Sequence, residues 1–160
     1  MYKLDIEQRS WEWHDRRWGN VTGTSLKDAL GSDKVKHKLL CRLVSERMSE
    51  TVVGEIHSAA IQHGLDMEDT AREAVIKATG IQFIETGLLL SEERPRFSIS
   101  PDAIFERDGK IVSGLEIKCP SSSTHIGYLI NGGVPKEYLH QVMASFIMSD
   151  DVEFWYFASF

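Results

Sequence analysis

The stretch that most constrains the fold is SISPDAIFERDGKIVSGLEIKCP, residues 98–120. Two runs of alternating apolar and polar residues flank the dipeptide Asp108-Gly109, a pair typical of a tight hairpin turn. We therefore expect antiparallel strands at about 97–106 and 111–118. A chain built around such a hairpin needs a sheet with at least one covered face.

Charged side chains occupy an unusual place on this hairpin. Glu116 and Lys118 project from the same face of the second strand, because successive side chains of a strand alternate. Asp102, which follows Pro101, comes alongside through the hairpin. A half-exposed strand with a polar face is the simplest interpretation of Glu116 and Lys118 alone. Two carboxylates converging near a lysine instead favour a Mg²⁺ site for phosphate chemistry, with the lysine acting on a water or on developing charge.

The rest of the chain predicts helices and further strands around this hairpin. We expect an amphipathic start at 3–15, a helix from Thr24 or Ser25 to Leu30, helices at 35–48, 56–79 and 136–149, strands at 81–91 and 152–159, and a connecting segment at 121–135. The predicted fold class is α/β (α+β), with a mixed central β-sheet flanked by helices.

Composition describes an ordinary globular chain. Its 160 residues are most economically one domain, and Cys41 and Cys119 form no metal-binding or disulfide pattern. The net charge of −6 at first argues against a nucleic-acid partner. The acidic residues are concentrated in residues 51–160, however, where 16 Asp and Glu face eight Lys and Arg, and an acidic half is compatible with divalent metal binding.

A third acid lies on the predicted helix 56–79. Glu68 falls on the same helical stripe as Ala71 and Val75, so it faces inward and needs a compensating partner. An ion pair with Arg72 is one interpretation, and a third carboxylate at the metal site is the other. Asp66 and Asp69 lie off the stripe, where we expect them to be solvated.

Together these residues resemble a known family. Pro101-Asp102 followed by Glu116-Ile117-Lys118 is the PD-(D/E)XK signature of metal-dependent nucleases. More narrowly, the chain resembles the phage-type alkaline exonucleases, the lambda exonuclease-like, YqaJ-like viral recombinase family. The similar segments, in family order, are WHDRRWGNVTGT (13–24), GLDMEDTAR (64–72), SPDAI (100–104), GLEIKCP (114–120), YLHQVMASFIM (138–148) and WYFASF (155–160).

The resemblance implies a role for each matching residue. Asp102, Glu116, Glu68 and the carbonyl of Ile117 would bind two Mg²⁺ ions, for which Mn²⁺ could substitute. Lys118 would activate the attacking water, and Gln141 would reach the catalytic centre. The residues that would recognise the 5′-phosphate of the digested strand are Arg17, Thr24 and Ser100. A restriction-endonuclease-like core is the fold that the resemblance implies.

The implied activity is digestion of linear double-stranded DNA in the 5′-to-3′ direction, giving mononucleotides and 3′ overhangs for a single-strand annealing protein in phage recombination. The alternatives are a PD-(D/E)XK endonuclease with the same metal site and an inactive DNA-binding module. A homo-oligomer is compatible with the resemblance because relatives form ring-shaped trimers, but the end at Phe160, where relatives continue, disfavours a trimer.

The organisation that we expect is a single nuclease domain over 1–160. Its N-terminal helical part, about 1–55, would cover a catalytic core at about 56–160. The sequence has neither a signal-peptide layout nor an apolar run long enough for a membrane span, so we expect a cytoplasmic protein of a bacterial host, encoded by a phage or prophage, with no membrane partner.

Overall fold

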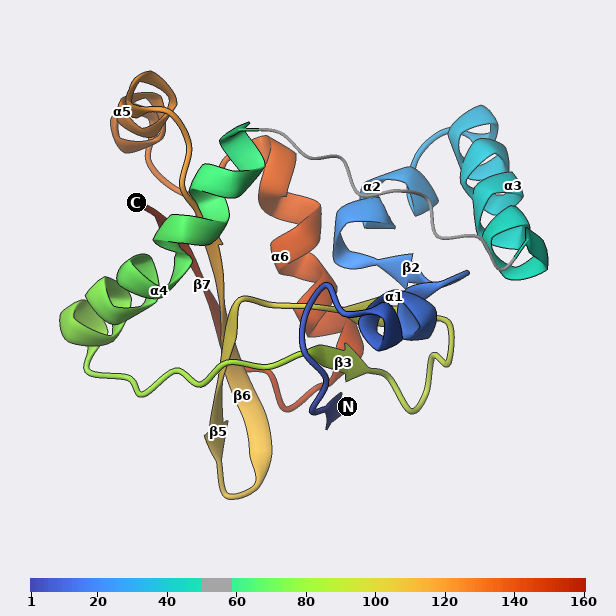
Figure 1. Ribbon diagram of the computed structural model, residues 1–160, viewed down its shortest axis with the longest axis horizontal. Coiled ribbons are helices and arrows are strands. Elements are labelled where there is room, and N and C mark those ends of the chain that lie inside the picture. The colour runs from blue at the N-terminus through green and yellow to red at the C-terminus, as the bar shows by residue number, and fades with distance from the viewer. Residues whose placement is uncertain (50–58) are drawn as a thin grey trace.

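A β-hairpin forms the centre of the structure, which is a computed structural model that describes residues 1–49 and 59–160 (Figure 1). Strands β5 (Ala103–Arg107) and β6 (Lys110–Lys118) pair antiparallel. The predicted hairpin is confirmed.

The turn of this hairpin has the backbone that its sequence predicts. Asp108 and Gly109 both adopt positive φ angles, 54° and 75°, as a tight hairpin turn requires. A β-bulge between Phe105 and Glu106 shifts the register, which pairs Ala103 with Leu115 beyond it.

The fold contains two small β-sheets. In the first, β6 lies between β5 and a parallel partner, β7 (Phe154–Ser159), so the pairing is mixed as predicted. The second has the order β1-β3-β4-β2, where β2 and β4 are parallel and the other pairs antiparallel. Its strands are β1 (Tyr2–Leu4), β2 (Val21–Thr22), β3 (Leu88–Leu90) and β4 (Phe97–Ile99).

Two of the predicted strands were too long. The strand predicted at 97–106 is divided at Ser100–Asp102, where the chain leaves β4 and enters β5. The division coincides with Pro101, which has no N–H to donate to a ladder. The strand predicted at 81–91 is reduced to β3, and only Ile84 of its first half makes an isolated bridge.

The amphipathic start predicted at 3–15 is instead the strand β1 followed by a helix that begins only at Trp11. After that helix, the helices that cover the sheets follow the prediction with one exception. The helices are α1 (Trp11–Arg17), α2 (Leu26–Ala29) after the 3₁₀ turn η1 (Gly23–Ser25), α3 (Asp33–Ser49), α4 (Ala59–Thr79), α5 (Ser122–Asn131) and α6 (Lys136–Met148). The predicted start of the α4 helix at 56–58 lies outside the described residues. Its predicted end is confirmed, since Gly80 follows with a φ of 74° and donates its N–H to Ile76.

The exception is α5, where we predicted a connecting segment at 121–135. Its first turn is a run of serine and threonine, which are weak helix formers in a helix interior. Its apolar residues Ile126, Leu129 and Ile130 are largely exposed, so they do not form the buried stripe that identifies a packed helix.

Two apolar cores lie on opposite faces of the hairpin. α6 contributes Ala144 and Met148 to one core, where they pack with Ile104. α4 contributes Ala71 to the other core, which includes Leu115 and Ile117 of β6. Figure 1 shows the hairpin between these two helices. Since Leu115 and Ile117 face α4, the alternate residues of β6 face the α6 side.

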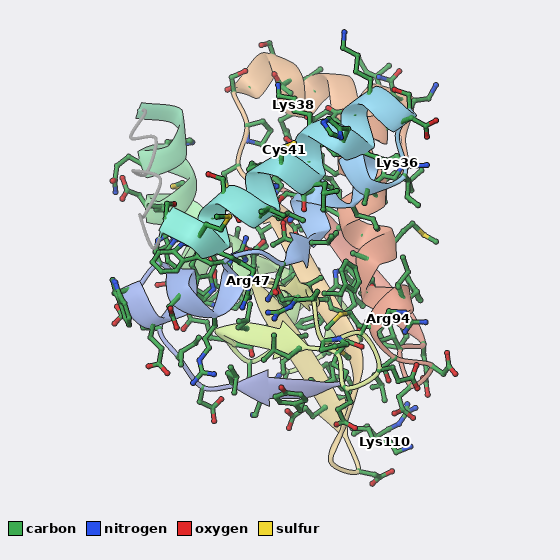
Figure 2. The ribbon with its side chains drawn as sticks, turned by 90° about the vertical axis from the view of Figure 1, so that its right-hand side faces the viewer. Lys36, Lys38, Cys41, Arg47, Arg94 and Lys110 are labelled. Atoms are coloured by element: carbon green, nitrogen blue, oxygen red, sulfur yellow. The ribbon has the colours of Figure 1, made fainter. Side chains whose placement is uncertain are left out.

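α3 lies at the edge of the fold, and Figure 2 shows Cys41 on it. Cys41 is exposed. Across residues 1–49 and 59–160, no helix combines the length and the apolar character that crossing a membrane requires.

Candidate active site

A buried carboxylate is the centre of the site. Glu116 on β6 is only 3% exposed, although it is an acid. Its Oε1 accepts hydrogen bonds from Nζ of Lys118 and Nε2 of Gln141, which reaches it from α6. A buried charge requires such partners. The structure thus brings together three of the predicted site residues.

Burial and pairing act in opposite directions on this acid and its lysine. Burial raises the pKa of Glu116, and the charge of Lys118 counters part of that effect. Burial alone would lower the pKa of Lys118, but the carboxylates of Glu116 and Asp102 outweigh it and raise this pKa above its usual range. The lysine therefore holds its proton while it is paired.

Asp102 lies where the chain passes from β4 to β5. Its Oδ2 accepts the backbone N–H of Ile117 at 2.5 Å, and its own N–H donates to the carbonyl of Leu115 at 3.1 Å. Burial and the nearby charge of Glu116 raise the pKa of Asp102 to about 6, against the opposing effect of Lys118. The division of the predicted strand thus places this carboxylate beside β6.

Glu68 reaches the same region from α4. Its side chain is 18% exposed, and Oε2 lies 3.6 Å from Nη2 of Arg9. Burial and the charge of Asp102 raise its pKa, while Arg9 lowers it. The alternative partner, Arg72, instead pairs with Asp69 and with Glu85.

The two acids of that helix that we predicted to be solvated behave as expected. Asp66 and Asp69 are both exposed.

The three acids are close enough to affect one another. Glu116 raises the pKa of Asp102, Asp102 raises that of Glu68, and Glu68 raises that of Glu116. Within the described ranges, no three His, Cys, Asp or Glu side chains stand as a ready-made metal cage. Mg²⁺ does not need one, since it is commonly held by one or two carboxylates plus waters and substrate phosphates. The oxygen donors therefore fit Mg²⁺.

A cavity of about 360 Å³ opens on one side of the acids. Glu68, Asp102, Ile117 and Lys118 line it, so four predicted site residues share one space. The other described residues of its wall are Arg9, Gly64, Leu65, Cys119, Pro120 and Tyr138. We call it the acidic cavity.

Cys119 is half-buried in the acidic cavity. Burial and the charges of Glu68 and Asp102 raise the pKa of its thiol.

A second, smaller cavity of about 40 Å³ adjoins Glu116. It brings together the three residues predicted to recognise a 5′-phosphate, although they come from α1, η1 and the end of β4. Its described residues are Arg17, Gly23, Thr24, Ile99, Ser100, Pro101, Glu116, Gln141 and Trp155. We call it the arginine cavity.

Packing fixes the arginine of this cavity. The Arg17 guanidinium lies 3.8 Å from the ring centroid of Trp13, and burial lowers its pKa to about 10. Trp13 in turn donates its Nε1–H to Ser100 Oγ at 2.7 Å, and Ser100 donates to the carbonyl of Gly87. Arg17 and Ser100 are thus held by one shared tryptophan.

The elements around Glu116 are closely packed. A Cβ on Gly114 would overlap the ring of Trp155, which covers that part of β6. A Cβ on Gly23 would lie 3.4 Å from Cγ of Gln141, so η1 packs directly on the glutamine that holds Glu116.

Sequence reasoning missed Arg9 and Tyr138. Tyr138 stacks on Phe157 with ring centroids 5.4 Å apart, and Nζ of Lys118 lies 5.3 Å from the Tyr138 centroid. Both missed residues line the acidic cavity. No local pattern marks them, because only the tertiary fold brings them to β6.

Comparisons with known proteins give the family of the chain. The sequence model of the YqaJ-like viral recombinase domain matches residues 12–151. The chain therefore belongs to the YqaJ-like viral recombinase domain family. No curated protein matches the chain.

Two solved structures share the fold at appreciable identity. One is an alkaline exonuclease, LHK-Exo, from Laribacter hongkongensis, with 27% identity and a TM-score of 0.81. The other is LHK-Exo in complex with dAMP, with 28% identity and the same TM-score. Each match covers 94% of this chain and 74% of the other. These matches confirm the predicted PD-(D/E)XK-like fold class.

Proposed function

We propose that the protein is a metal-dependent exonuclease that degrades linear double-stranded DNA from 5′-phosphorylated ends. Digestion would proceed 5′ to 3′, release mononucleotides and leave 3′ overhangs for a single-strand annealing protein. The observation that carries the proposal is a pair of cavities at the same end of β6. One holds Arg17, hydroxyls and Glu116, and the other holds Glu68, Asp102 and Lys118. Membership of the family and similarity to an alkaline exonuclease support it.

The metal proposal rests on the chemistry of the donors. Asp102 and Glu116, with Glu68 and the Ile117 carbonyl, would hold Mg²⁺ or Mn²⁺, and two ions are the number that we propose. When bound, such ions activate water and stabilise charge on the reacting phosphate. The protein's own side chains would orient the water, the carboxylates and the DNA strand.

Lys118 and Gln141 both act on Glu116 at the acid-bearing end of β6. Gln141 donates to Glu116 and so orients that carboxylate. Lys118 carries a proton while Glu116 compensates its charge. It can orient a water or neutralise charge on phosphate in that state, and it becomes a base when the pH rises or when the charge of Glu116 is withdrawn.

Arg17 explains a preference for phosphorylated ends. Guanidinium binds phosphate oxygens in pairs, and the Thr24 hydroxyl adds a donor in the same cavity. Ser100 would donate to a phosphate by exchanging its hydrogen bond to the Gly87 carbonyl. A small cavity that holds the terminal phosphate fixes the distance to the next phosphodiester. That geometry favours release of one nucleotide at a time.

The decisive experiment uses linear duplex DNA with a 5′-phosphate on one strand and a 5′-hydroxyl on the other. Wild type with Mg²⁺ should release mononucleotides stepwise from the phosphorylated strand. Lys118→Ala should lower the rate by about 10²- to 10⁴-fold, the usual contribution of a positioned acid or base. Lys110→Ala is the matched control, because it removes an exposed lysine from the far end of the same strand.

The same assay separates the alternatives. Internal cuts, with closed circles also attacked, would replace the exonuclease with an endonuclease that uses the same acids. Binding of the duplex without cleavage in Mg²⁺ or Mn²⁺ would indicate an inactive DNA-binding module. Equal losses on phosphorylated and hydroxyl ends in Arg17→Ala would contradict the role proposed for the arginine cavity.

A further inference from the structure

Arg9 has a backbone conformation that its residue type disfavours. Its φ is +67°, in the left-handed region that residues other than glycine rarely adopt. Both neighbours are fixed: Gln8 Nε2 donates to the carbonyls of Thr86 at 2.8 Å and Pro101 at 2.9 Å, and Ser10 caps α1 by accepting from Trp13 N. Such strain persists where the surroundings enforce it, and it often marks a functional position.

The strained backbone presents the Arg9 side chain to the acidic cavity. The guanidinium stands 3.6 Å from Glu68, which is longer than the 2.7–2.9 Å typical of a charge-assisted hydrogen bond. The side chain is also 43% exposed. It is therefore held near the acids without being saturated by them, and donors remain for a ligand.

Arg9 is also the accessible cation of this wall. Among the described residues that line the acidic cavity, the positive side chains are Arg9 and Lys118, and Lys118 is committed to Glu116. An anionic polymer entering a cavity lined by Glu68 and Asp102 would meet repulsion unless a cation received it. Arg9 supplies that cation.

The two cavities define a direction for the bound strand. The linings of the arginine cavity and the acidic cavity are consecutive in the chain at the acid-bearing end of β6: Pro101 and Glu116 line the first, and Asp102 and Ile117 line the second. If a 5′-phosphate occupies the arginine cavity and the first phosphodiester lies at the acids, the strand continues into the acidic cavity. The next phosphate along the strand then faces Arg9.

We propose that Arg9 binds the phosphate between the second and third nucleotides of the digested strand, the one on the 3′ side of the bond that is cut. This inference rests on the proposed function. A guanidinium suits the task because it pairs with phosphate oxygens through two N–H groups. Arg9 thus acts as a positioning residue that sets how far the strand advances.

Metal-free binding tests the contact without cleavage. Fluorescence anisotropy in EDTA would measure the Kd of 5′-phosphorylated duplex DNA against KCl concentration. A second duplex would carry one neutral methylphosphonate between nucleotides 2 and 3. Arg9→Gly removes the guanidinium and suits the left-handed backbone, so its unfolding temperature should not fall below that of wild type.

The expected result is specific to one phosphate. Arg9→Gly should weaken binding by about three- to tenfold at low salt and reduce the slope of log Kd against log salt by about 1. The methylphosphonate should weaken wild-type binding by a similar factor and leave the affinity of Arg9→Gly unchanged. Arg107→Ala, which removes another half-exposed, ion-paired arginine from the hairpin, should change neither quantity.

Two results would overturn the inference. Arg9→Gly with the affinity and salt slope of wild type would make Arg9 only a counter-ion of Glu68. Equal sensitivity of both proteins to the methylphosphonate would place the phosphate contact elsewhere. A wild type that digests phosphorylated ends but shows either result removes the Arg9 proposal alone, whereas a wild type that neither binds nor digests this DNA removes the proposed function with it.

Discussion

Two lysine–carboxylate pairs stand at the two ends of β6 and differ almost entirely in their surroundings. At the hairpin end, Lys110 bonds Asp151 at 2.7 Å, with side chains 63% and 44% exposed. Figure 2 shows Lys110 at that tip. At the other end, Lys118 bonds Glu116, with side chains 27% and 4% exposed.

The same kind of ion pair has different energetic consequences at the two ends of the strand. An exposed pair is solvated whether or not it forms, so it contributes little to stability. A buried pair has lost its hydration, and each partner depends on the other for compensation. The buried pair is therefore vulnerable to loss of either partner, and it is also the one whose charges can act on a ligand.

Substitution of the two lysines should give the largest difference in stability between the two ends of β6. Lys118→Met should lower the free energy of unfolding by about 3 kcal/mol at pH 8, because it leaves Glu116 charged and buried beside Gln141 alone. Lys110→Met should leave the denaturant midpoint unchanged. Urea unfolding followed by circular dichroism would measure both.

Acid pH gives an internal control for this result. Burial raises the pKa of Glu116, so the acid becomes neutral more readily than in the unfolded chain, and the cost of Lys118→Met should shrink as the pH falls toward 4. A cost that stayed constant with pH would indicate lost packing against Tyr138 rather than an unpaired charge.

Asp102→Asn should have the next largest effect, and in the opposite direction. Asparagine keeps an oxygen for the Ile117 N–H and removes a charge that the site disfavours. At pH 8 in EDTA the variant should be more stable than wild type by an amount on the order of 2 kcal/mol, since each pKa unit corresponds to about 1.4 kcal/mol. Thermal unfolding between pH 4 and pH 8 would test this.

The raised pKa of Asp102 also sets the pH range over which the stability of the wild type should change. With a folded pKa of about 6 against an ordinary 3.8, native Asp102 binds its proton more readily than the unfolded chain does. Wild-type stability should therefore fall as the pH rises from 4 to 6 and then level off, which opens the gap to the variant. Mg²⁺ should stabilise wild type more than Asp102→Asn; an equal response would remove Asp102 from the proposed metal site.

A small, salt-dependent effect is expected at the exposed end of the hairpin. Arg107 pairs with Glu153 there, and both side chains are about half exposed. Arg107→Ala should cost less than about 1 kcal/mol at low salt, and the difference should vanish in 1 M NaCl, where exposed charges are screened over about 3 Å. The effect of Lys118→Met should persist at that salt concentration. Loss of both effects in 1 M NaCl would mean that burial does not protect the Lys118–Glu116 pair from screening.

Local patterns were enough to predict one end of β6. Alternation places Glu116 and Lys118 on one face, and the Asp108-Gly109 turn brings Asp102 alongside. Both rules act over neighbouring residues or a single turn, so they do not depend on the rest of the fold. The same logic placed Glu68 on the inward stripe of its helix.

Patterns failed where long-range packing decides the structure. Ile81 and the residues after it suggested a strand, but regular pairing there is limited to β3 and one bridge at Ile84. In α5, Ile126, Leu129 and Ile130 have the i, i+3, i+4 spacing of a helix, but the serines before them and Gly132-Gly133 after them favoured a connecting segment. Arg17, Thr24 and Ser100 followed only from resemblance, because no local rule joins α1 to the end of β4.

The two cysteines have a practical consequence for studying this protein. Cys41 is exposed on α3, whereas Cys119 is half-buried in the acidic cavity with a raised thiol pKa. The thiolate is the form that attacks an alkylating reagent, so Cys41 offers an internal reference for a slower reaction at Cys119. The ratio of the two labels, measured by mass spectrometry, would report occupancy of the acidic cavity, because a bound ligand would shield Cys119 and leave Cys41 accessible.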